Sequence, residues 1–329
     1  MIHTEDADSA RFIRGLKAGD AALVSAAPKG DLHVHGLCGG TRKDYMAWCG
    51  QTLPPPPRVF PDFTDFDHYL LVTLARPYSG CEGADLWKFF AFFFRNTLEN
   101  AIADGVTVIE PSIDSSVVDI FGGDAVLMAE EINRIIAETA AARPSAVLDV
   151  RPELGMAKGI PLALLESWVP AALSTGIFKS IDLYGDERVG DDADYVPFYR
   201  MARERGLRLK AHAGELRGSS SVRRSVELFD LDAVQHGISA AEDPAVMEFL
   251  AARGTVLNVC PTSNVRLGRA PSIASHPVSA LSKAGVPVTI NTDDRIVFDA
   301  SLSEEYLSLY REGVFTAEEL NGIRLRSLL

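Results

Sequence analysis

Short apolar runs and longer amphipathic segments alternate along most of the chain. The apolar runs predict eight strands, at residues 31–35, 106–110, 147–154, 178–183, 208–212, 233–236, 256–259 and 287–291. Amphipathic helices are predicted at residues 124–142, 195–206, 243–254 and 276–285, and three of these segments end in glycine, which readily closes a helix. Strands that alternate with helices are typical of parallel βα units. The pattern therefore predicts an α/β fold, a (β/α)8 TIM barrel.

Residues from about 40 to 100 depart from this alternation. A proline run at 54–57 interrupts the chain, and two aromatic-rich stretches follow it. We expect a helical insertion after the first strand that covers one mouth of the barrel, where it either shapes a substrate pocket or serves packing alone. A length of 329 residues suits one large barrel. A single domain over residues 1–329 is therefore expected.

Composition and charge narrow the classes of partner. The chain is 47% hydrophobic and has a net charge of −13, which argues against binding a nucleic acid polymer, because that requires a surplus of Lys and Arg. The four cysteines form no CxxC pair, so free thiols are expected. The longest hydrophobic stretch, residues 86–94, contains Lys88 and is too short to cross a membrane. We expect a cytoplasmic protein without membrane contact, and a small base or nucleoside remains a compatible ligand.

Polar side chains gather where the predicted strands end. These residues are His33 and His35, Asp182, His212, His236, Cys260, Asp293 and Asp294. In a barrel the carboxyl ends of the strands share one face, where active sites are built. Three histidines and a carboxylate form a ligand set suited to Zn²⁺ or a similar divalent ion. A metal-activated water, a base and an acid such as Glu215 would make a hydrolytic site.

Each of these signals also has a structural interpretation when taken alone. The paired histidines at 33 and 35, like His212, can be buried side chains satisfied by the backbone. The "NTDD" stretch at 291–294 can cap a helix, since Asp favours that position. For His68 and His276, packing or capping is the preferred interpretation. The chain contains neither a GxGxxG motif after a strand nor a GxxxxGK[ST] motif, which argues against hydride or phosphoryl transfer.

Six ordered motifs carry a resemblance to a known family. "PKGDLHVHG", "DLYGDE", "KAHAGE", "VQHGI", "CPTSN" and "NTDD" resemble the adenosine/adenine deaminases of the amidohydrolase superfamily, from about residue 28 to 310. The resemblance implies that His33, His35, His212 and Asp293 bind one Zn²⁺. It also implies a reaction, the hydrolysis of a 6-aminopurine to a 6-oxopurine with release of ammonia.

The same resemblance implies roles for four further positions. Glu215 would protonate a ring nitrogen of the purine, and His236 would act as base or electrostatic partner of the attacking hydroxide. Asp294 would orient that hydroxide and contact the imidazole side of the ring. The backbone N–H of Gly185 would hold the remaining pyrimidine nitrogen.

One position departs from the family pattern and bears on the substrate. Two residues after the paired histidines the family has an acid that binds ribose hydroxyls, and here that position is Leu37. A buried hydroxyl without a partner costs about 1–3 kcal/mol. The main hypothesis is therefore a deaminase of adenosine or a sugar-modified adenosine, with free adenine or an aminodeoxyfutalosine-type substrate as alternatives. A non-catalytic purine-binding protein is the least favoured hypothesis, and the oligomeric state stays open.

Overall fold

Parallel strands wind into a barrel in the computed structural model, which describes residues 2–329. The strands are β1 (Lys29–His35), β2 (Val106–Asp114), β3 (Asp149–Val150), β4 (Glu153–Ala157), β5 (Ser180–Tyr184), β6 (Arg208–Ala213), β7 (Ala233–His236), β8 (Val256–Val259) and β9 (Val288–Ile290). Their order is β1-β2-β4-β5-β6-β7-β8-β9, and the short β3 pairs with β2. A parallel bridge between Val34 and Asp293 brings the end of this series back to β1. The predicted (β/α)8 barrel is confirmed.

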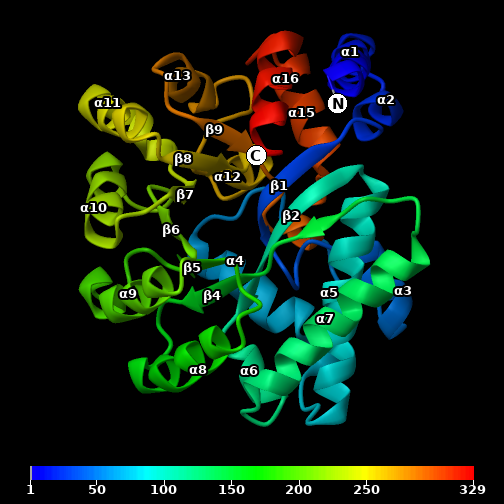
Figure 1. The fold of residues 1–329 in the computed structure, drawn as a ribbon, viewed down its shortest axis with the longest axis vertical. Helices are drawn as coiled ribbons and strands as arrows, with labels where there is room; N and C mark the ends of the chain where they lie inside the picture. The colour runs from blue at the N-terminus through cyan, green and yellow to red at the C-terminus, as the bar shows by residue number, and fades with distance from the viewer. Residues whose placement is uncertain (1) are drawn as a thin grey trace.

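Helices surround the strands, as Figure 1 shows. In chain order the α-helices and the shorter turns are α1 (Ile2–Ala18), α2 (Ala21–Ser25), α3 (Arg42–Cys49), α4 (Phe63–His68), the π-helix η1 (Tyr69–Leu74), the 3₁₀ turn η2 (Arg76–Tyr78), α5 (Ala84–Ala103), α6 (Val117–Ile120), α7 (Ala125–Ala142), α8 (Leu162–Ser174), η3 (Asp192–Tyr195), α9 (Val196–Glu204), α10 (Ser219–Phe229), η4 (Ile238–Glu242), α11 (Pro244–Arg253), α12 (Pro261–Arg266), α13 (Val278–Lys283), α14 (Arg295–Phe298), α15 (Leu302–Arg311) and α16 (Ala317–Arg326).

The four helices predicted from periodicity correspond to α7, α9, α11 and α13. Asp124 and Asp243 cap the N-termini of α7 and α11 through their side chains, and Gly254 ends α11 in the left-handed conformation. The strand predicted at 147–154 is wrong in its extent. Pro152, which has no N–H for a ladder, separates the two-residue β3 from β4, and the strand that belongs to the barrel wall continues to Ala157.

The helices α3, α4 and α5 lie between β1 and β2, as the predicted insertion requires. An aromatic cluster that includes Tyr45, Phe63 and Phe66 packs against Phe298, which lies in α14 just after β9. Because residues after β9 follow the carboxyl end of that strand, this cluster covers the mouth where the predicted site lies. Phe94 of α5 belongs instead to the barrel core, so α5 also acts as a wall helix.

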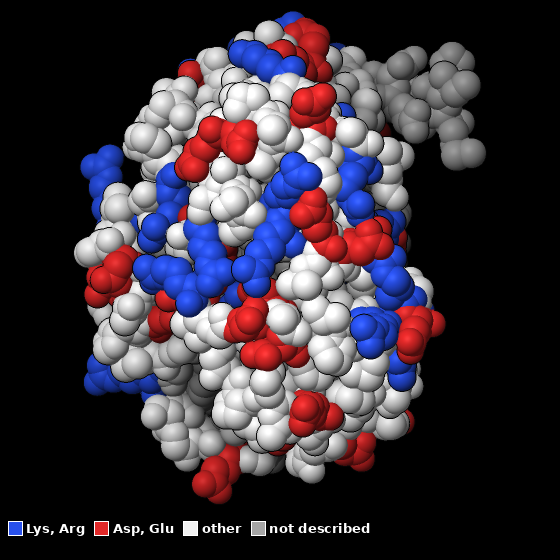
Figure 2. All heavy atoms as spheres, turned by 90° about the vertical axis from the view of Figure 1, so that its left-hand side faces the viewer, with Lys and Arg blue, Asp and Glu red and all other residues white. Residues whose placement is uncertain are grey.

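The outer face made by α8–α11 carries both signs of charge. Figure 2 shows Lys and Arg side chains interspersed with Asp and Glu on this side of the molecule. Arg223 pairs with Glu227 at 2.9 Å and Arg203 pairs with Asp230 at 2.8 Å. Ion pairs between neighbouring side chains therefore neutralise part of the charge on this face. Among residues 2–329, no helix combines the length and hydropathy that a membrane span needs.

Candidate metal and active site

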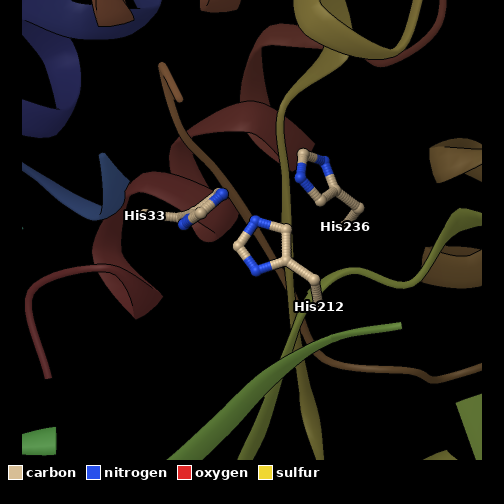
Figure 3. Close-up of side chains that lie close together, drawn as sticks. All are labelled: His33, His212 and His236. Carbon is tan, nitrogen blue, oxygen red and sulfur yellow. The ribbon is translucent and has the colours of Figure 1, made fainter. Parts of the chain in front are cut away.

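Three histidines from separate strands meet inside the barrel. His33 of β1, His212 of β6 and His236 of β7 are buried, and one ring nitrogen of each lies within 4.8 Å of the others. The ring of His33 is 4.7 Å from that of His212 and 5.1 Å from that of His236, and Figure 3 shows the three rings side by side. Residues about 200 positions apart thus converge at one point of the barrel.

The other predicted ligands lie at the same place. The Nε2 atoms of His33 and His35 are each 3.5 Å from Oδ1 of Asp293. Donor atoms of His35, Asp293 and Asp294 also lie within 4.8 Å of one another. The structure therefore brings the four predicted ligands together and adds His236 to their immediate neighbourhood.

Asp182 orients His212. Its carboxylate oxygens lie 3.2 and 3.3 Å from Nδ1 of His212, which leaves Nε2 of that ring free for another partner. A carboxylate on the far nitrogen is the usual support of a metal-binding histidine. The prediction that Asp182 ends its strand is wrong, because it lies in the middle of β5.

Unpaired polar atoms show that this cluster suits a cation. Within the described part of the chain, both ring nitrogens of His33 and one carboxylate oxygen each of Glu215 and Asp294 are buried without a hydrogen-bond partner. Burial lowers the pKa of His33 and His212, which keeps their imidazoles neutral and able to ligate. Burial, followed by the charge of Asp294, raises the pKa of Asp293 to about 7. A divalent cation would relieve both the unpaired atoms and the repulsion between carboxylates.

Glu215 is held in place by an acid that the sequence analysis did not single out. The carboxylate of buried Glu187 accepts three backbone N–H groups, from Gly214 at 2.9 Å, Glu215 at 2.7 Å and Leu216 at 2.9 Å. Burial and the charges of Asp293 and Glu187 raise the pKa of Glu215 well above its usual range. The buried carboxyl of Glu215 therefore keeps its proton to higher pH than an ordinary glutamate does. The motif "DLYGDE" contained Glu187, but nothing in its spacing indicated this partner.

Two residues of the cluster, His236 and Asp293, have unusual backbone conformations. Both have positive φ angles, 62° and 60°, although neither is glycine. Such conformations cost about 1–3 kcal/mol and concentrate at functional sites. Asp294 stands at the N-cap position of α14 but makes no side-chain capping hydrogen bond. The side chain of Asp294 therefore does not cap α14, contrary to the capping interpretation of "NTDD".

The predicted substrate-binding positions follow β1, β5 and β9 in the chain. Gly185 follows β5 with a φ of 94°, which favours glycine. It adjoins Tyr184, whose ring lies 4.9 Å from that of His35 and which the sequence analysis missed. Leu37 is partly buried and packs against both the barrel core and the aromatic cluster of the insertion.

The two histidines for which packing or capping was predicted differ in exposure. His68 is exposed at the end of α4, whereas His276 is buried and accepts the N–H of Val278.

Relatives of known name decide the family. A Treponema pallidum protein, provisionally named an adenosine/adenine deaminase, is 33% identical over 303 residues, 90% of this chain and 97% of that protein. The chain belongs to the adenosine/adenine deaminase family. The family model for adenosine deaminase matches residues 167–328. The protein is therefore a deaminase that hydrolyses C–N bonds.

Further members of the adenosine/adenine deaminase family match parts of the chain. An adenine deaminase of Agrobacterium fabrum is 38% identical over 63% of both chains, and an aminodeoxyfutalosine deaminase of Acidothermus cellulolyticus is 39% identical over 41% of this chain and 40% of that protein.

Solved structures share the barrel. They include an adenine deaminase from Arthrobacter aurescens, with a TM-score of 0.77 and 22% identity over 91% of this chain and 93% of that chain. An amidohydrolase from Burkholderia ambifaria with bound Zn has a TM-score of 0.76 and 21% identity over 94% of this chain and 87% of that chain. At these identities the likeness supports the fold.

Proposed function

We propose that this chain is a zinc-dependent adenine deaminase, which hydrolyses adenine to hypoxanthine and ammonia. The observation that carries the choice of substrate is Leu37, an apolar side chain packed under the insertion where the family pattern has a sugar-binding acid. Loss of a sugar contact does not matter for a free base. The names of the relatives also favour this alternative over the nucleoside hypothesis, which was the main one from sequence.

The proposed metal ligands are His33, His35, His212 and Asp293. Neutral imidazoles together with a carboxylate are common ligands of Zn²⁺, and the Burkholderia relative of the same fold contains Zn. When bound, such an ion lowers the pKa of a water and so supplies hydroxide near neutral pH.

The chain's own residues would complete the reaction. Protonated Glu215 donates its proton to the ring nitrogen beside the amino-bearing carbon, which lets the ring accept electrons from the attacking oxygen. Asp294 orients the attacking oxygen and contacts the imidazole side of the ring, and the N–H of Gly185 holds the remaining pyrimidine nitrogen. His236 interacts with the attacking oxygen either as a base or as a hydrogen-bond donor. Water and adenine are thereby converted to hypoxanthine and ammonia.

A substrate panel tests this proposal. Ammonia release is measured with adenine, adenosine, a 5′-modified adenosine and aminodeoxyfutalosine, with and without a chelator. We expect adenine to have the highest kcat/KM and the chelator to abolish turnover. A preference for aminodeoxyfutalosine would transfer the assignment to the activity in the name of the Acidothermus relative. No turnover of any aminopurine by zinc-loaded protein would refute the deaminase function.

Zinc content tests the ligand set, because the compact histidine group contains His236 rather than His35. His35→Gln should lose bound zinc, whereas His236→Gln should retain about one zinc per chain and lose activity. Zinc is measured by atomic emission after dialysis. The opposite result would assign His236 as the ligand in place of His35.

A further inference from the structure

A line of buried hydrogen bonds reaches His236 from the side opposite the metal ligands. The backbone N–H of Val278 donates to Nδ1 of His276 at 3.1 Å. Nε2 of His276 lies 3.3 Å from Oδ1 of Asn264, and Nδ2 of Asn264 lies 3.1 Å from Nδ1 of His236. All three side chains are buried, with Asn264 completely inaccessible. Bulk solvent therefore does not reach these groups.

The direction of every bond in this line follows from its first donor. A backbone N–H can only donate, so Nδ1 of His276 carries a lone pair, and the proton of the neutral ring is on Nε2. Burial lowers the pKa of His276 to about 4, which keeps the ring neutral. Nε2–H of His276 then donates to Oδ1 of Asn264. The amide consequently presents its N–H to His236, whose Nδ1 must accept.

The reverse arrangement is disfavoured. Turning the amide of Asn264 would place its N–H against the N–H of His276, and two buried donors would face each other. Another acceptor near Nδ1 of His236 is Oε1 of Glu215, but at 3.6 Å it is too distant for a hydrogen bond. A proton on Nδ1 of His236 would thus be left without a partner.

We propose that Asn264 and His276 are positioning residues that hold His236 in the Nε2–H tautomer. This proposal rests on the proposed function. His236 then donates a hydrogen bond to the attacking oxygen and does not take its proton, which chooses between the two roles left open above. Nε2 of His236 lies 3.9 Å from Oδ2 of Asp293, so its N–H faces the proposed ligand set. A group other than His236 then carries the proton of the attacking water to the departing ammonia.

Asn264→Asp tests the line with almost no change of shape. A carboxylate accepts from both neighbours, so His236 should move its proton to Nδ1. Imidazole ¹⁵N shifts report the tautomer, and the His236 signals are assigned by their loss in His236→Gln. We expect Nε2–H in the wild type, Nδ1–H in Asn264→Asp, and a kcat lowered about 10²-fold with KM for adenine and zinc content unchanged. Nδ1–H in the wild type, or an unchanged kcat in Asn264→Asp, would overturn the proposal.

Two substitutions of His276 separate positioning from packing. Asn at 276 can accept the N–H of Val278 as Nδ1 does but cannot reach Asn264, whereas Gln can place an N–H where Nε2–H lies but loses the backbone contact. We expect His276→Asn to lower kcat about tenfold and His276→Gln to retain most of it, whatever their melting temperatures. Equal effects of the two variants on kcat would show a merely structural role and contradict the proposal.

The two proposals fail differently. If zinc-loaded wild type does not deaminate adenine, the proposed function fails, but the ¹⁵N shifts of wild type and Asn264→Asp still decide the tautomer. If adenine is deaminated and His236 carries its proton on Nδ1, the function stands and the positioning role of Asn264 is refuted.

Discussion

Replacing Glu187 by Gln should disable Glu215 without touching the metal ligands. One oxygen of Glu187 accepts the N–H groups of Glu215 and Leu216, and the other accepts that of Gly214. Gln retains one oxygen and presents an N–H₂ group to the third donor. Glu187→Gln therefore keeps the shape of the side chain while it breaks one of the three contacts that position the acid.

The magnitude follows from these contacts. An unpaired buried N–H costs about 1–3 kcal/mol, and the two remaining bonds lose the assistance of the negative charge. If most of this cost appears as misalignment of Glu215, a loss of about 2 kcal/mol in transition-state stabilisation lowers kcat roughly 30-fold. Zinc content should stay at the wild-type value, because the predicted ligands are unchanged.

A pH profile gives a second signature of the same change. The charge of Glu187 helps to raise the pKa of Glu215. An acid that acts in its protonated form loses activity as the pH rises through its pKa. Removal of the Glu187 charge lowers that pKa, so the alkaline limb of the kcat profile should move to lower pH in Glu187→Gln.

The assay is steady-state ammonia release from adenine between pH 5 and 10, with zinc content and melting temperature measured on the same samples. Glu227→Gln is the matched control, because it removes an exposed carboxylate paired with Arg223 on the outer face. The control should behave as wild type. A Glu187→Gln protein with wild-type kcat and an unshifted alkaline limb would refute the positioning of Glu215 by Glu187.

Three further changes have defined outcomes. Glu215→Gln should retain zinc and lose about 10²–10⁴-fold in kcat, and full activity would exclude it as the proton donor. Leu37→Asp should raise the kcat/KM ratio of adenosine to adenine about tenfold, and an unchanged ratio would remove position 37 from substrate selection. Burial raises the pKa of Glu305 to about 8 from an ordinary 4.5, although it accepts the N–H of Thr262. Its folded-state pKa exceeds the unfolded one, so the stability that this carboxyl contributes is lost as the pH rises from about 4.5 to about 8. Glu305→Gln, which cannot ionise, should therefore raise the melting temperature more at pH 8 than at pH 5, and equal shifts would contradict this.

Much of the architecture is readable from local patterns. Four-residue runs such as 233–236 and 256–259 coincide with β7 and β8, because an apolar run flanked by polar or glycine residues is a property of neighbouring positions. The split of the strand predicted at 147–154 was missed, although Pro152, which has no N–H for a ladder, stands between β3 and β4. Helix α1 was also missed, and its Phe12 packs edge-on against Tyr306 of α15, a contact between distant parts of the chain.

The sequence by itself determined the chemical types at the strand ends, the barrel class and the family motifs. Tertiary structure alone decided which of those side chains face one another. It placed Glu187 against the backbone of Glu215 and linked His276 through Asn264 to His236. Hydrogen-bond partners are chosen by distance and direction in space, and no local periodicity records contacts across about 30 residues. The physical roles of Glu187 and His276 therefore emerge only when the barrel closes.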